Sequence, residues 1–97
     1  MRLQPDEISA IKAAATEAFG ADVVVRLFGS RADDSRRGGD IDLHLEVGAL
    51  PGLMPRSRFL DLVEASTDGR KVDTVFTVRG TVPTGFEKIA YRDGIPL

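Results

Sequence analysis

The sequence contains no cysteine. A disulfide framework, a thiolate metal site and a cysteine nucleophile are therefore all excluded, and packing has to hold the fold. No apolar run approaches the roughly 18 residues of a membrane span. The chain also turns acidic at Asp6, before any apolar run begins, which is unlike a signal peptide. We therefore expect a cytoplasmic protein that makes no membrane contact.

An excess of positive charge is also absent. Thirteen lysines and arginines face 15 aspartates and glutamates, which gives a net charge of −2. This balance supplies no uniform positive field for wrapping nucleic acid, so strong nucleic-acid binding is not expected. Ninety-seven residues with 42% hydrophobic and 29% charged content fit one small domain over residues 1–97.

Three segments have the patterns of helices. Apolar residues recur at helical spacing over 5–20, after an acidic first turn and before a terminal glycine. A shorter apolar stripe covers 59–63 and fades at 66–69. A third helix is predicted within 84–94, where a threonine and a glutamate have the spacing of a capping box.

Three further segments have the patterns of strands. Residues 23–28 are almost continuously apolar, which predicts a strand buried on both faces. Residues 40–47 alternate strictly, with one apolar face and one acidic face, and 72–78 form the third strand. Polar residues 30–39 and the Gly- and Pro-containing segment 48–55 are expected to be connections. This order predicts an α/β or α+β domain with helices packed on a small mixed sheet.

The most informative pattern joins Gly29 and Ser30 to Asp40 and Asp42, with the first aspartate ten positions after the serine. A Gly-Ser turn after a buried strand lets backbone amides approach a phosphate, especially where a helix begins. Arg31 can add charge-assisted hydrogen bonds. Taken alone, however, Gly29 and Ser30 also fit an ordinary turn.

Asp40 and Asp42 share one face of the predicted strand, roughly 6–7 Å apart along it. Two carboxylates about 4 Å apart repel by roughly 4 kcal/mol at an effective dielectric constant near 20, so such a cluster favours a cation. Mg²⁺ prefers oxygen ligands, and two such ions can stabilise an in-line displacement at phosphorus. If the third strand neighbours the second, Asp73 can serve as a third ligand or as a general base.

At these residues the chain resembles the nucleotidyltransferase superfamily typified by DNA polymerase β, specifically its minimal bacterial members. The matching segments are 27–32 (LFGSRA), 39–43 (GDIDL) and, more loosely, 71–75 (KVDTV). The resemblance implies a nucleotidyltransferase fold in which the Gly-Ser turn holds nucleotide phosphates. The residues that it implies for nucleotide binding are Gly29, Ser30 and Arg31, and those for Mg²⁺ binding and catalysis are Asp40, Asp42 and Asp73.

The resemblance also implies a partner. Small members of this family act as antitoxins of helical HEPN-domain toxins, and some transfer AMP from ATP to a tyrosine of the toxin. We therefore expect a Mg²⁺-dependent protein adenylyltransferase that uses ATP, works as the antitoxin of a HEPN-type toxin and forms a hetero-oligomer with it. Because a single small domain leaves no second domain to present an acceptor, the acceptor is expected to come from another molecule.

Other interpretations of the sequence remain open. Asp40 and Asp42 also fit a solvated strand face balanced by nearby arginines, and Asp73 also fits a solvent-facing position. The chain can instead be a binding module that masks its partner without catalysis, or a transferase that acts on a small molecule. His44 is expected to be a surface histidine, because imidazole is a poor Mg²⁺ ligand. Tyr91, the only tyrosine, is expected to pack the last helix rather than to accept a nucleotide.

Overall fold

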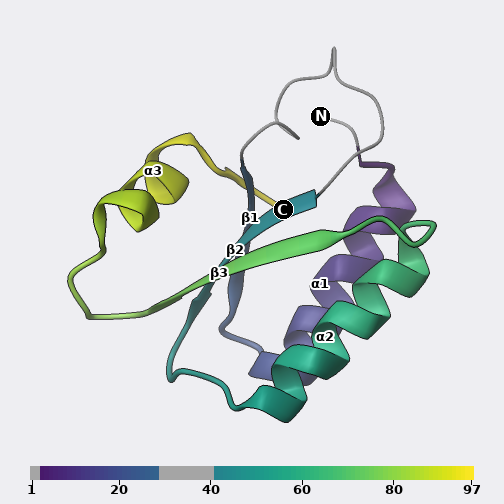
Figure 1. Cartoon of the computed structure of the whole chain (residues 1–97), viewed down its shortest axis with the longest axis horizontal. Helices are drawn as coiled ribbons and strands as arrows, with labels where there is room; N and C mark the ends of the chain where they lie inside the picture. The colour runs from purple at the N-terminus through teal and green to yellow at the C-terminus, as the bar shows by residue number, and fades with distance from the viewer. Residues whose placement is uncertain (1–2, 29–40) are drawn as a thin grey trace.

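The computed structural model describes residues 3–28 and 41–97. Within these residues, three helices pack on a four-stranded mixed sheet (Figure 1). The predicted α+β class is therefore confirmed. In chain order the elements are α1 (Pro5–Phe19), β1 (Val24–Phe28), β2 (Ile41–Val47), α2 (Leu53–Ser66), β3 (Val72–Val78), α3 (Gly85–Asp93) and β4 (Ile95–Pro96).

The sheet has the strand order β3-β2-β1-β4. Strand β1 is antiparallel to both β2 and β4, whereas β2 and β3 are parallel. Strand β4 was not among the predicted strands, because its two residues are too few to show an alternating pattern. A Cβ atom at Gly94 would lie 3.0 Å from Cβ of Arg26 and closer still to the Ala90 carbonyl oxygen, so glycine lets the chain pass from α3 into β4.

Helices α1 and α2 cover one face of the sheet (Figure 1). The predicted core face of β2 points toward them, since Ile41, Leu43 and Leu45 are completely buried. The ring of Phe19 on α1 joins both layers: its centroid lies 5.2 Å from that of Phe59 on α2 and 5.3 Å from that of Phe76 on β3. This apolar layer is the hydrophobic core of the domain.

Helix α3 lies on the opposite face of the sheet (Figure 1). It covers the polar side of β2, so that His44 is completely buried, and Asp42 and Glu46 are half-buried. The expectation that His44 lies on the surface is therefore wrong. The alternation of β2 shows which residues share a face, but it does not show that a short amphipathic helix later in the chain covers that face.

The helix termini follow local sequence signals, with one exception. Gly20 ends α1 with a φ of 102°, and Thr84 caps α3 by accepting a hydrogen bond from the Glu87 amide at 3.2 Å, as predicted. Helix α2, however, begins at Leu53, inside the predicted connection 48–55. Pro55 fits there because the first turn of a helix needs no amide donor. No helix in residues 3–28 or 41–97 is long and apolar enough to cross a membrane.

Candidate functional site: paired aspartates beneath helix α3

Two predicted site residues lie side by side on the sheet. Asp42 of β2 is the direct register partner of Asp73 of β3, and it is also paired with Phe28 at the end of β1. Directly opposed residues of neighbouring strands share a face, and the strands lie about 4.8 Å apart. Strand β3 is therefore the neighbour of β2, and both carboxylates occupy the face that carries α3.

A hollow of about 550 Å³ opens at this pair of aspartates. Helix α3 supplies one wall and the three strands supply the floor. The rings of Phe28 and Phe86 meet edge to face there, with centroids 5.8 Å apart. The lining residues are Phe28, Asp42, Asp73, Val75, Phe86, Ile89 and Asp93.

The hollow combines three carboxylates with an apolar wall. Nζ of Lys71 lies 3.7 Å from an oxygen of Asp73, whose side chain is 49% exposed. Asp93 accepts a hydrogen bond of 2.9 Å from Nε of Arg92, and this bond lowers the pKa of Asp93. Both cations lie outside the lining, so the described wall of the hollow is itself acidic and apolar.

A chain of hydrogen bonds, which runs from the buried His44 to the exposed Thr84, joins α3 to the sheet. The hydroxyl of Thr77 donates to Oε1 of Glu87 at 2.7 Å, and its oxygen lies 2.9 Å from Nε2 of His44. A hydroxyl has a single proton, so Thr77 must accept from His44, and Nε2 carries the imidazole proton. The carboxylate of Glu87 also accepts from the Thr84 hydroxyl at 2.9 Å. The hydrogen bonds from Thr77 and then Thr84 lower the pKa of Glu87.

A second polar group joins α3 to β1. The guanidinium of Arg26 lies 4.7 Å from the ring centroid of Tyr91 and 3.0 Å from an oxygen of Glu46. Burial alone would raise the pKa of Glu46, but hydrogen bonds from Arg79 and Arg26 outweigh it and lower that pKa. Burial, and then the charge of Glu46, raise the pKa of Tyr91. Tyr91 is half-buried against His44 and Arg26, in agreement with the expected packing role.

The remaining predicted site residues, Gly29, Ser30, Arg31 and Asp40, lie outside the described residues. In the sequence, Gly29 follows Phe28 and Asp40 precedes Ile41. Asp42 and Asp73 are therefore the two predicted ligands whose positions the structure gives.

The donor set of the described residues fits a divalent cation that takes oxygen ligands. Carboxylates at opposed positions of adjacent strands repel one another, and Mg²⁺ accepts one or two carboxylates together with water and phosphate oxygens. No group of three or more His, Cys, Asp or Glu side chains suited to a metal ion occurs within 3–28 and 41–97. The remaining ligand predicted from the sequence is Asp40, which lies outside the described residues.

Sequence reasoning missed the apolar half of the hollow. Phe86 and Ile89 lie on the predicted third helix. They line the hollow, and their exposed fractions are 57% and 48%. Helical periodicity placed them on an apolar stripe, but nothing in the stripe indicates which strand it faces. Comparison of the chain with protein-family models finds no match, and comparison with curated protein sequences finds none either.

Proposed function

We propose that the protein is a Mg²⁺-dependent nucleotidyltransferase that transfers AMP from ATP to a hydroxyl group of a partner protein. The observation that carries this proposal is the direct opposition of Asp42 and Asp73 in the floor of the hollow. A pair of carboxylates beside an open cavity can hold a divalent cation, and such a cation neutralises the negative charge of a phosphate in the cavity. The sequence pattern of Gly29, Ser30 and Asp40 supports the same chemistry.

Asp42 and Asp73, together with Asp40, would hold Mg²⁺. When bound, the ion would neutralise charge on the phosphate oxygens during the displacement. The acceptor oxygen forms a bond to the α-phosphorus, the bond to the bridging oxygen of the β-phosphate breaks, and pyrophosphate leaves. The exposed carboxylate of Asp73 is suited to accept the proton of the acceptor hydroxyl.

The acceptor is proposed to belong to a HEPN-type toxin, with the protein acting as its antitoxin. Support comes from the resemblance of the sequence and from the open wall of the hollow. Phe86 and Ile89 are half exposed on α3, and large apolar side chains beside a polar cavity are typical of a contact surface. A partner that covers them would place its own hydroxyl group near Asp73.

The test is transfer from ATP labelled at the α-phosphate. The purified chain is incubated with Mg²⁺ and with the protein encoded by the neighbouring reading frame, beside a sample that contains a chelator. Asp42→Asn should abolish labelling of the partner and leave the fold intact. The matched control is Asp61→Asn, which changes an exposed aspartate on α2. Full labelling by Asp42→Asn would contradict the proposal.

The masking module is the alternative outcome. If the chain binds its partner and ATP but adds no label, neutralisation works by covering the toxin. The doubly substituted Asp42→Ala, Asp73→Ala chain would then neutralise the toxin in cells as well as the natural chain does.

A further inference from the structure

Among residues 3–28 and 41–97, strand β3 is one edge of the sheet. Its seven residues contain no proline and a single charged residue, Asp73. The other edge is β4, which has two residues, one of them Pro96. Natural sheets protect their edges by short strands, prolines and charges, because an unprotected edge pairs with other chains. Of the two edges that the described residues form, β4 has this protection in its own sequence and β3 does not.

The hydrogen bonds of the ladder show which groups of β3 face outward. The Ile41 amide donates to the Lys71 carbonyl at 2.9 Å, and the Arg79 amide donates to the Val47 carbonyl at 2.7 Å. Both β3-side residues are odd-numbered, and in a parallel ladder alternate residues face the neighbouring strand. The even-numbered residues therefore direct their amides and carbonyls away from β2. Those within the strand are Val72, Thr74, Phe76 and Val78, and the carbonyl of Val78 already accepts a hydrogen bond from the Thr81 amide.

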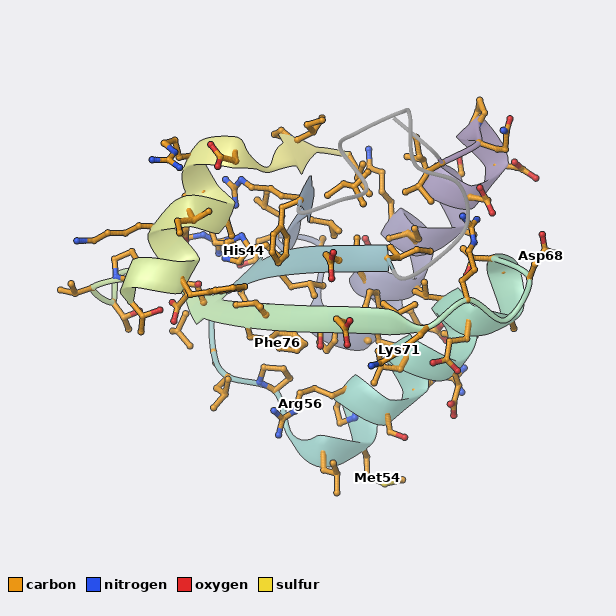
Figure 2. The ribbon with its side chains drawn as sticks, turned by 45° about the horizontal axis from the view of Figure 1, so that its top comes forward. His44, Met54, Arg56, Asp68, Lys71 and Phe76 are labelled. Carbon is orange, nitrogen blue, oxygen red and sulfur yellow. The ribbon has the colours of Figure 1, made fainter. Side chains whose placement is uncertain are left out.

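Each face of this edge carries a hollow. On the α3 side, Asp73 and Val75 line the hollow of about 550 Å³ described above. On the α2 side, Thr74 and Phe76 line a second hollow of about 410 Å³. Figure 2 shows Phe76 and Arg56 between β3 and α2, where the guanidinium carbon lies 6.0 Å from the ring centroid. A strand added to β3 would point alternate side chains into the two hollows.

The two hollows differ in chemistry. The one beside α2 sets the apolar side chains of Leu53, which is 74% exposed, Leu60 and Phe76 beside three polar residues, Arg56, Ser57 and Thr74. It suits an aliphatic side chain. The one beside α3 sets Phe86 and Val75 next to the carboxylate of Asp73. That combination suits an aromatic ring that carries a hydroxyl group, with the ring on the apolar wall and the hydroxyl group toward the carboxylate.

We infer that an extended segment of the partner protein pairs with the outer edge of β3 and presents the acceptor hydroxyl of a tyrosine to Asp73. This inference rests on the proposed transfer reaction for the role of the hydroxyl group, but not for the pairing itself. The outward backbone groups of β3 pair with no other strand of the described residues, which identifies the occupant as an extended chain, and the alternation of the hollows sets the alternation of its side chains. The occupant has apolar residues on the α2 side and the tyrosine on the α3 side.

The probe is a synthetic peptide, Lys-Val-Thr-Val-Tyr-Val-Thr-Val-Lys, which has this alternation. Its binding to the full chain is measured by fluorescence anisotropy without nucleotide, and amide hydrogen exchange is followed at Thr74 and Phe76. Thr74→Pro removes an outward amide and leaves the ladder to β2 complete, since proline is tolerated at such edge positions. Thr74→Val is the matched control, because it changes the side chain and keeps the amide.

The expected result is that Thr74→Pro weakens peptide binding at least tenfold, Thr74→Val changes it less than twofold, and the peptide slows exchange at Thr74 and Phe76. Absence of that protection in the natural chain overturns the inference, whether or not Thr74→Pro folds. A chain that is dimeric in sedimentation, and monomeric as Thr74→Pro, would also overturn it by assigning the edge to a second copy.

The two proposals fail separately. Peptide that binds the edge but gains no label from ATP and Mg²⁺ contradicts the transfer reaction and leaves the pairing intact. Label that reaches the tyrosine equally well with the natural chain and with Thr74→Pro contradicts the pairing and leaves the transfer reaction intact.

Discussion

Nε2 of His44 donates a hydrogen bond of 2.9 Å to the hydroxyl oxygen of Thr77, in the layer between the sheet and α3. Nδ1 of the same ring is buried and has no hydrogen-bond partner among the described residues. A second proton on the ring would therefore introduce a buried, unsatisfied donor. Burial, and then the charge of Arg26, lower the pKa of His44, while the carboxylates of Glu46 and Glu87 oppose the shift.

The first prediction concerns the stability of the protein below neutral pH. An unfolded histidine has a pKa near 6.5. Because the pKa of His44 is lower in the folded state, the unfolded chain binds more protons at mildly acidic pH. The free energy of unfolding should thus be fully retained above about pH 7 and should fall as the pH decreases through 6.5 and below. Urea unfolding at a series of pH values measures this.

His44→Gln provides the control. An amide side chain can still donate to Thr77 but does not titrate. Between about pH 7 and pH 5, its free energy of unfolding should change less than that of the natural chain. If the free energy of unfolding falls equally with pH in the two proteins, His44 does not cause the loss of stability. The carboxylates of the protein would then cause it even in this pH range.

The second prediction concerns the effect of Mg²⁺ on stability. A ligand that binds only the folded state raises its stability in proportion to the logarithm of ligand concentration. Millimolar Mg²⁺ should therefore raise the melting temperature of the natural chain, and EDTA should reverse the increase. In EDTA, Asp73→Asn should melt close to the natural temperature, because it removes the repulsion from Asp42 together with the exposed ion pair with Lys71. It should lose most of the Mg²⁺-dependent increase, and a full increase in this variant would exclude Asp73 as a ligand.

Much of the fold was predictable from local pattern. The alternation over 72–78 and the helical spacing over 5–20 each depend on burial against one layer, so the sequence carries a strong periodic signal. The sequence did not predict the first turn of α2, which begins at Leu53. Its apolar residues Leu53 and Met54 are exposed and therefore add nothing to the periodic pattern of buried positions. A pattern that arises from burial cannot mark a turn that is not buried.

The candidate site was predictable only in part. The two-residue spacing of Asp40 and Asp42 indicates a shared face, but the neighbour of that face is a matter of topology. The parallel pairing of β2 with β3, which sets Asp73 beside Asp42, joins segments about 30 residues apart. The burial of His44 has the same origin, since α3 reaches it from the end of the chain. Long-range contacts of this kind leave no periodic trace in the sequence.

The third prediction concerns the core between α1 and α2. Phe59 is completely buried and contacts the ring of Phe19. Phe59→Ala should lower the free energy of unfolding by about 3–5 kcal/mol, because it removes buried apolar surface and leaves a cavity. Leu53→Ala, on the same helix but 74% exposed, should change it by less than about 0.5 kcal/mol. Chemical denaturation of both variants measures the difference, and similar losses would mean that the surface around Leu53 is not exposed in solution.

The last prediction concerns Tyr91. Its ring lies 4.7 Å from both the imidazole centroid of His44 and the guanidinium of Arg26, and its hydroxyl group interacts with Glu46. Tyr91 does not line the hollow beside Asp73. A raised pKa also disfavours its phenolate. The chain incubated alone with labelled ATP and Mg²⁺ should therefore gain no label on Tyr91.

Tyr91→Phe separates packing from modification. The variant keeps the ring contacts and loses only the hydroxyl group, so its free energy of unfolding should fall by at most about 1 kcal/mol. Labelling of the partner protein should equal that of the natural chain. Label that appears on the natural chain and disappears in Tyr91→Phe would instead identify Tyr91 as an acceptor, which would require α3 to leave the sheet and carry the hydroxyl group from Glu46 to the paired aspartates.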